Sequence, residues 1–351
     1  MSKKKAVLIL GVFVDETARI KNIRTAEDRI AAMFRNNGVP VITSSAAAGK
    51  AKRFADTVST LIAQRKNYDI AIVPLFGTWP SFLWQEIITR LLKFFNKKII
   101  LGIHGGSIPE RIDKGAQRFY TAMKRADILF APSTYFSSLF KNKGFDIRVI
   151  ENPVDLSAYT FCIKEKIRPR IIWMRAFTDV YNPFMAVRVA KRLAEKYTEF
   201  EMIMAGKEGL LSDAVKTMAK DFGLNDKIVF PGYISMRQKQ QYAAEYDIYI
   251  CTNKIDNTPV SLTEFMQFGL PIVSVNTGGI PYMIEDGTNG LLVNADDDEA
   301  MFQKINTLIN NHSFAQTIIT NAYTYVQQYS ETNVMKKWNA VLNERGNTKD
   351  N

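Results

Sequence analysis

Short apolar runs recur along this chain of 351 residues, and each is separated from the next by a segment long enough for a helix. Such runs are typical of strands buried on both faces of a parallel sheet, where successive strands need crossover connections. The sequence therefore predicts an α/β protein with parallel sheets. We expect strands at residues 6–14, 39–44, 68–76, 98–104, 127–132 and 148–150, and again at 170–175, 201–205, 227–230, 248–252, 271–275 and 291–293.

A turn-rich break at Glu151–Asp155 divides this pattern into two halves. The chain length suits about two domains. We predict an N-terminal Rossmann-like domain over residues 1–152 and a C-terminal Rossmann-like domain over residues 156–322, facing each other across a cleft. Ligands bind outside the carboxyl ends of parallel strands, so residues that directly follow a strand are candidates for the site.

The segment Asp256–Pro281, DNTPVSLTEFMQFGLPIVSVNTGGIP, describes a helix whose N-terminus is open to an anion. Thr258 can cap this helix and Pro259 suits its first position. The N–H groups of Val260 and Ser261 would then have no intrahelical partner, which makes the helix end a site for phosphate.

An acidic side chain, Glu264, interrupts the apolar face of this helix before Gly269 ends it. Helical side chains lean toward the N-terminus, so we expect the carboxylate to point back toward the anion site. Asp256 stands eight positions earlier. Two acceptors around a phosphate cradle suit a nucleotide sugar, which has a pyrophosphate between hydroxyl-rich groups. The alternative is a Rossmann-like helix whose glutamate merely faces solvent.

From Asp256 to Val293 the chain resembles the donor-binding signature of retaining, GT-B-fold glycosyltransferases of family 4, the glycosyl transferases of group 1. In that signature two carboxylates eight positions apart flank an apolar helix, followed by G-x-P and Gly-Gly-x-Pro. The first carboxylate is usually Glu, and here it is Asp256. Weaker similarity covers nearly the whole chain. The resemblance implies a GT-B fold whose C-terminal helix, about 323–345, returns to complete the first domain.

The same resemblance implies metal-independent, retaining sugar transfer from a nucleotide-diphosphate sugar, with no cofactor. The diphosphate would lie against Arg175 and the amides at the start of the helix, Glu264 would bind the ribose hydroxyls, and Asp256 the sugar. His104 would act beside the reacting sugar. The implied catalytic residues are His104, Asp256 and Arg175, the donor-binding residues are Arg175, Lys207, Tyr233, Ile234, Asn257, Thr258, Pro259, Val260, Ser261 and Glu264, and the acceptor side has Gly105 and Gly106.

Several of these residues follow predicted strands, and each also has an ordinary structural explanation. Arg175 could be a surface residue, His104 a core histidine and Tyr233 a packing residue. Family members usually carry Lys about six residues after the arginine, where this chain has Tyr181, and Lys207 is a candidate to compensate. A catalytically weak or inactive GT-B-like nucleotide-sugar-binding protein is therefore the alternative function.

The net charge of +11 lies entirely in the first half of the chain. Residues 1–155 hold 25 Lys and Arg against 13 Asp and Glu, or +12, and residues 156–351 hold 21 against 22, or −1. This asymmetry suggests an anionic acceptor (a glycan or lipid-linked acceptor), peripheral contact with an anionic membrane, or nucleic acid as the weakest of the three. No arginine-rich run supports nucleic acid as a partner.

The aromatic segment Trp79–Lys98, with Lys93, Lys97 and Lys98, could form a core helix or lie on an anionic membrane.

Other motifs argue against other kinds of function, namely ATP or dinucleotide binding and metal binding, and against disulfide-rich or exported proteins. Residues 46–51 lack the first Gly and final Ser/Thr of a P-loop, and no GxGxxG follows a strand. The acidic run Asp296–Glu299 suits the start of a helix better than a metal site. Two distant cysteines, Cys162 and Cys251, indicate neither a disulfide framework nor zinc. Asp15 and Glu16 follow the first apolar run where a signal-peptide cleavage site would be, so we expect a cytoplasmic protein, at the inner face of the membrane if it binds lipid.

Overall fold

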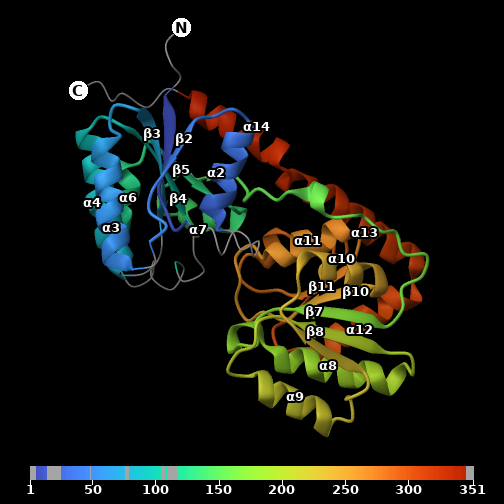
Figure 1. Ribbon diagram of the computed structural model, residues 1–351. Coiled ribbons are helices and arrows are strands. Elements are labelled where there is room, and N and C mark those ends of the chain that lie inside the picture. The colour runs from blue at the N-terminus through green and yellow to red at the C-terminus, as the bar shows by residue number, and fades with distance from the viewer. Residues whose placement is uncertain are drawn as a thin grey trace. The chain divides into compact units, whose positions relative to one another are not determined.

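The computed structural model describes residues 5–13, 25–47, 49–75, 79–103, 108 and 117–344. The chain forms two compact units, one from Met1–Val154 with Tyr329–Asn351 and the other from Asp155–Gln328. Each unit contains a six-stranded parallel sheet with helices on its faces (Figure 1). The chain enters the second unit at the end of the turn-rich segment Glu151–Asp155.

The first sheet has the strand order β2-β1-β3-β4-β5-β6, and all its described pairs are parallel. Its strands are β1 (Ala6–Ile9), β2 (Val41–Thr43), β3 (Tyr68–Leu75), β4 (Lys98–Ile103), β5 (Ile128–Ala131) and β6 (Arg148–Val149). Its helices are α2 (Ala26–Asn36), α3 (Lys50–Ala63), α4 (Trp79–Phe94), α6 (Gln117–Arg125), α7 (Thr134–Lys141) and α14 (Glu331–Asn343).

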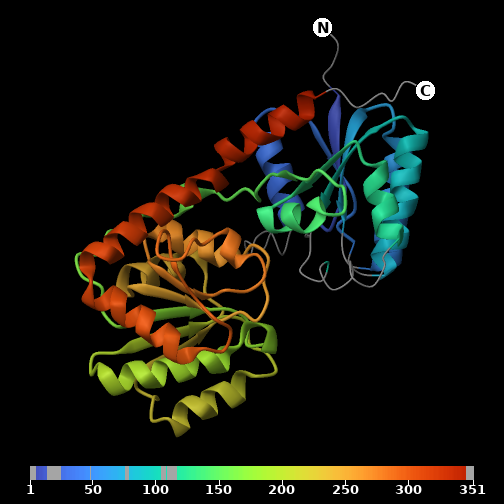
Figure 2. The ribbon, with the colours of Figure 1, turned by 180° about the vertical axis from the view of Figure 1, so that it is seen from behind.

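Both faces of this sheet are buried, as the unbroken apolar runs predict. Val7 and Ile9 of β1 pack with α2 and α14 on one face. Leu8 and Leu10 point the other way and pack with α3 and α4. Figures 1 and 2 show these two helical layers, with α6 beside α4. The apolar run at the start of the chain therefore forms a core strand.

The C-terminal segment returns to the first unit, but the single helix expected over about residues 323–345 is interrupted. Helix α13 (His312–Val326) ends in the second unit and a 3₁₀ turn, η4 (Gln327–Tyr329), follows it. The side chain of Ser330 then caps α14, because it accepts an N–H of that helix's first turn. Trp338 of α14 is fully buried and packs edge-to-face on rings of α2 and β5 at 5.3 and 4.8 Å.

The second sheet has the order β12-β11-β10-β7-β8-β9, again with parallel pairs. Chain order reverses at β7, so β7 and β10 flank the topological switch point of this sheet. Its strands are β7 (Arg170–Met174), β8 (Glu201–Ala205), β9 (Ile228–Gly232), β10 (Ile248–Cys251), β11 (Ile272–Val275) and β12 (Leu291–Val293). Its helices include α8 (Pro183–Lys196), α9 (Ser212–Asp221), α10 (Met236–Glu245), α11 (Val260–Phe268), α12 (Asp298–Asn310) and α13.

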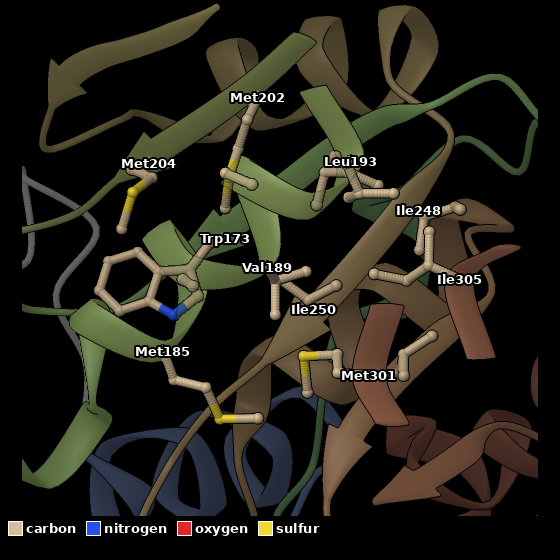
Figure 3. Packing of buried hydrophobic residues seen from close by; sticks show 14 of the residues in the cluster. Trp173, Met185, Val189, Leu193, Met202, Met204, Ile248, Ile250, Met301 and Ile305 are labelled. Atoms are coloured by element: carbon tan, nitrogen blue, oxygen red, sulfur yellow. The ribbon is translucent and has the colours of Figure 1, made fainter. Parts of the chain in front are cut away.

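A core rich in methionine fixes β7 and β10 from one side of the second sheet. Figure 3 shows Trp173, Met185 and Met204 packed together, with Ile250 and Met301 nearby in the same cluster. The indole N–H of the buried Trp173 donates to a threonine hydroxyl at the end of β10 over 2.8 Å. These contacts hold the ends of β7 and β10, where ligands bind in sheets of this kind, in a fixed relation.

Helix α4 is a core helix, which was one of the two expectations for the aromatic segment. Ile88 and Leu92 are buried in the first unit, while the ring of Phe94 is 81% exposed. The three neighbouring lysines have intramolecular partners. Lys93 pairs with Asp127 at 2.7 Å, Lys97 donates to the Tyr68 carbonyl at 2.7 Å, and Lys98 donates to the Val341 carbonyl at 2.7 Å. The described chain contains no helix of the length and apolarity needed to cross a bilayer.

One buried carboxyl in this unit predicts a pH effect on stability. Burial raises the pKa of Glu27, in the first turn of α2, from 4.5 to about 7. The folded state therefore binds this proton more tightly than the unfolded state, so the free energy of unfolding falls as the pH rises between these two values. We expect Glu27→Gln to be more stable than wild type by about 3 kcal/mol near pH 8 and no more stable near pH 4. Urea unfolding at both pH values measures the difference, and equal stabilities at about pH 8 would contradict it.

Candidate functional site

Polar residues gather at the carboxyl edge of the second sheet, on both sides of its switch point. Arg175 directly follows β7, and Asn253 and Asp256 lie in the loop after β10. β7 and β10 are neighbours in the sheet, so the two chain segments leave it side by side. Crevices of this kind are where open α/β sheets bind ligands.

Arg175 lies where the sequence places it and faces Asp256. One guanidinium nitrogen is 3.3 Å from Asp256 Oδ2, and the two side chains are 14% and 23% exposed. The guanidinium also lies over the ring of Tyr181, 5.4 Å from its centroid, in a cation–π contact. The aromatic residue at the position of the family's usual lysine therefore holds the arginine.

Asp256 is fixed from several directions. The Asn253 side-chain amide donates to Oδ2 at 2.8 Å, and the Asn257 backbone N–H donates to Oδ1 at 2.8 Å. Three buried polar atoms have no hydrogen-bond partner within the described part of the chain: Nε of Arg175 and Oδ1 of Asn253, two residues that contact this carboxylate, and Oγ1 of Thr258, two positions further along the chain. Buried polar atoms are nearly always hydrogen-bonded, so this group has the capacity to bind a polar ligand.

The Gly-Gly pair of the motif supports the loop that carries Asp256. The Gly279 N–H donates to the Asp256 carbonyl at 2.8 Å. A Cβ atom at Gly278 would lie 2.1 Å from that carbonyl oxygen, and one at Gly279 would lie 2.1 Å from the Asn257 carbonyl oxygen. No other residue type fits this approach without moving the loop.

Helix α11 forms as expected but begins differently. Pro259, which we expected inside the helix, is its N-cap, and no side chain caps the helix. The prediction that Thr258 is the cap is therefore wrong, because the proline ring fixes the backbone at the cap position and the threonine hydroxyl stays buried beyond it. The N–H groups of Val260 and Ser261 are still the first of the helix and have no intrahelical partner. Gly269 ends the helix at φ 84°, as predicted.

Glu264 is almost buried and its carboxylate meets residues of two other segments. Lys239 Nζ of α10 lies 2.8 Å from each of its oxygens, and the Tyr159 hydroxyl donates to Oε1 at 3.0 Å. The side chains of Glu264 and Lys239 are 8% and 16% exposed. The sequence predicted that the carboxylate points back toward the anion site, and it did not predict these two partners.

A buried tyrosine braces the start of α11 against the sheet. The Tyr249 hydroxyl of β10 donates to the Ser261 hydroxyl at 2.8 Å, and its ring stacks on Phe265 at 4.1 Å. Burial raises the pKa of Tyr249, so this hydroxyl keeps its proton. The helix end that would bind phosphate is thereby fixed at the carboxyl edge of β10.

The other candidate residues fall into three groups. The Lys207 side chain is exposed just beyond β8. Tyr233 is 68% exposed, whereas the Ile234 side chain is 3% exposed, so only its backbone could meet a ligand. His104, Gly105 and Gly106 lie outside the described residues.

The acidic run before α12 is the start of a helix, as predicted. Asp297 caps α12 by accepting the Ala300 N–H at 2.8 Å. Asp298, in the first turn, pairs with Arg188 at 2.8 Å and with Arg192 at 2.7 Å.

Four residues of this edge were not predicted from the sequence: Tyr159, Lys239, Tyr249 and Asn253. Asn253 could have been found, since it directly follows a predicted strand. Lys239 lies in a polar helical segment with other cationic and amide side chains, and no spacing distinguishes it. Tyr159 and Glu264 are 105 residues apart, so their contact follows only from the fold.

Comparisons with known proteins find similarity to glycosyltransferases. Residues 163–325 match the model of the family Glycosyl transferases group 1. The chain is 23% identical over 253 residues to the putative colanic acid biosynthesis glycosyltransferase WcaL of Salmonella typhimurium, covering 68% of this chain and 62% of that protein. It is 25% identical over 161 residues to the poly(ribitol-phosphate) alpha-N-acetylglucosaminyltransferase of Staphylococcus aureus, covering 45% of this chain and 32% of that protein. The matched region is thus less than two thirds of either relative.

Solved structures share the fold. Anabaena Alr3699/HepE in complex with UDP and glucose superposes with a TM-score of 0.69 at 17% identity, covering 96% of this chain and 99% of that one. The two parallel-sheet units and the polar site at a carboxyl edge define a GT-B-fold protein. Within the second unit the chain is similar to the glycosyl transferases of group 1.

Proposed function

We propose that this chain is a retaining, metal-independent glycosyltransferase that moves a sugar from a nucleotide-diphosphate sugar to a glycan or lipid-linked acceptor. The observation that carries the proposal is the carboxyl-edge cluster of Arg175, Asp256 and the open end of α11. A cation, helix amides and a fixed carboxylate suit a diphosphate joined to a hydroxyl-rich sugar. The three buried atoms that have no partner in the described chain add capacity for such a ligand.

In the proposed mechanism the protein supplies position and electrostatics rather than a nucleophile. Arg175 and the first amides of α11 bind the diphosphate and stabilise the charge that develops as it leaves. Asp256 accepts hydrogen bonds from the sugar, and Glu264 from the ribose. The acceptor hydroxyl attacks from the face that the diphosphate leaves, and the departing phosphate takes its proton, so the anomeric configuration is retained. His104 is proposed beside the reacting sugar. Product anomericity, read by NMR, tests this step.

The acceptor is proposed to be anionic because residues 1–155 carry an excess of twelve positive charges, 25 against 13. One similar protein is named for transfer to poly(ribitol-phosphate), an anionic polymer. Contact with an anionic membrane is a weaker proposal. Lys93, Lys97 and Lys98 already have intramolecular partners, and they lie near the amino end of β4, away from the edge where ligands bind.

Tyr181 supports a second candidate, a nucleotide-sugar-binding protein with little turnover. The cation that family members usually have at this position is absent, and the tyrosine ring contacts Arg175 instead. Donor hydrolysis and transfer assays separate the two functions. Tight binding of a nucleotide sugar with neither reaction would favour the binding protein.

Replacing Glu264 with Gln is expected to weaken donor binding by about 1–3 kcal/mol, because a charged acceptor for hydroxyls becomes a neutral one. A thermal-shift screen of nucleotide sugars identifies the donor, since a ligand at about 100 times its Kd stabilises by about 2.7 kcal/mol. Calorimetry then compares the variant with Glu285→Gln, the same change at an exposed position. Equal donor affinity of Glu264→Gln and wild type would remove Glu264 from the site.

Chelation tests the proposed independence from metal. We expect EDTA to leave the transfer rate unchanged, because charge on the leaving diphosphate is neutralised by Arg175 and the helix end. The measurement is the initial rate with the identified donor before and after chelation. A large loss that magnesium or manganese restores would contradict the proposed mechanism.

A further inference from the structure

The cluster around Glu264 contains a feature that the proposed function does not explain. Lys239 lies 2.8 Å from both carboxylate oxygens, and Tyr159 donates to one of them at 3.0 Å. The tyrosine ring is itself held by Phe268 of α11, with ring centroids 5.1 Å apart. Two hydrogen-bond donors of the protein therefore already contact the carboxylate that is expected to bind the ribose of the nucleotide sugar.

The number of acceptor positions on Glu264 limits what it can bind. A carboxylate has about four lone-pair sites, two on each oxygen. In the described structure Oε1 accepts from both Lys239 and Tyr159, whereas Oε2 accepts from Lys239 alone. One acceptor position, on Oε2, is left for a ligand.

Burial argues that Lys239 stays in place when a ligand binds. The Glu264 side chain is 8% exposed, and Lys239 is its one cationic partner among the described residues. A carboxylate that loses such a partner at a buried position is strongly destabilised. A neutral ribose hydroxyl cannot replace the charge of the ammonium. The ribose must then bind beside the lysine.

We propose that Lys239 and Tyr159 are positioning residues that orient Glu264 so that its Oε2 accepts one ribose hydroxyl of the donor nucleotide. This inference rests on the proposed function and deepens it, because it predicts that Glu264 binds one of the two ribose hydroxyls of the nucleotide rather than both. Loss of one ribose hydroxyl weakens binding, and loss of the other has little effect. A carboxylate open on both oxygens would instead accept both hydroxyls.

The opposite role for Lys239 predicts the opposite result. If the lysine competes with the ribose for Glu264, its removal strengthens nucleotide binding. If it positions Glu264, its removal weakens binding. The sign of the change therefore distinguishes the two roles.

Calorimetry on the full chain uses the ribonucleoside diphosphates of uracil, guanine, adenine and cytosine as probes. The tightest is compared with its 2′-deoxy and 3′-deoxy forms. We expect one deoxy form to bind at least about tenfold more weakly than the parent and the other within about threefold. No binding of any diphosphate to wild type would overturn the proposed function together with this inference. Equal losses for the two deoxy forms would overturn the inference alone.

Lys239→Met is expected to weaken binding of the parent diphosphate by at least about tenfold. Lys239→Arg keeps a cation with two donors and should restore most of the affinity. The matched control is Arg237→Met, which removes an exposed cation from the same helix and should bind like wild type. Unchanged or tighter binding by a folded Lys239→Met would overturn the proposal.

A double-mutant cycle shows whether Lys239 acts on nucleotide binding through Glu264 or by contacting the nucleotide directly. If Lys239 acts through the carboxylate, Lys239→Met with Glu264→Gln binds like Glu264→Gln alone. Additive losses would overturn the positioning role.

Tyr159→Phe gives a test that does not depend on the lysine variants folding, since it keeps the ring on Phe268. It opens a second acceptor position, on Oε1, so the affinities of the two deoxy forms should move closer together. An unchanged ratio would count against the proposal.

Discussion

Replacing Arg175 with methionine is expected to lower kcat by about 10²–10³, because the cation that we propose binds the leaving diphosphate is removed from a largely buried position. Methionine keeps much of the length of the side chain, and most stabilising contacts of β7 are made by its other residues. Steady-state transfer with the identified donor measures the loss. Circular dichroism and thermal melting check that the fold is kept.

The matched control is Arg170→Met, at the opposite end of the same strand. Arg170 is 3.4 Å from Glu201 at the amino edge of the sheet, where ligands of such folds do not bind. We expect wild-type kcat for this variant. A kcat near wild type for Arg175→Met, with the donor bound, would mean that the positive charge at the leaving group comes from elsewhere, and Lys207 would be the next residue to replace.

The strands of both sheets and the position of the candidate site followed from local sequence, for identifiable reasons. Parallel strands buried on both faces leave uninterrupted apolar runs, and these predicted all twelve strands of the two sheets, although β1 ends at Ile9 and is shorter than the strand expected over residues 6–14. Arg175 was singled out because candidate ligand-binding residues of such sheets follow strands, and Asp256 because it stands eight positions before Glu264. Gly269 was found because a helix stop of this type needs a left-handed residue.

The interactions that the sequence did not predict join segments that are distant along the chain. The pairing of Lys239 with Glu264 brings together α10 and α11, which neither periodicity nor spacing relates. The basic run at Lys93–Lys98 looked solvated, yet Lys98 meets the Val341 carbonyl of the returning C-terminal helix. The start of α11 was misjudged because Thr258 and Pro259 both suit helix ends, and local preference does not decide which one takes the cap.

Replacing Gly278 with alanine is expected to destabilise the second unit by about 2 to 5 kcal/mol and to weaken donor binding. Two costs add. Gly278 has φ 57°, in the left-handed region, and its added Cβ would lie 2.1 Å from the Asp256 carbonyl oxygen. That oxygen belongs to the backbone and cannot rotate away, so the loop carrying Asp256 must move. Urea unfolding and donor calorimetry measure the two effects.

Gly223→Ala separates the clash from the backbone strain. Gly223 has φ 70°, close to that of Gly278, but a Cβ atom there meets nothing within 4 Å. The Gly223→Ala variant should therefore lose only the free energy of unfolding that left-handed backbone strain costs, about 1–2 kcal/mol. It should bind the donor like wild type. If the two variants lose equal stability and both keep the donor, the Gly-Gly pair serves only the turn. If Gly278→Ala alone loses the donor, the close approach to Asp256 is what positions this carboxylate for the sugar.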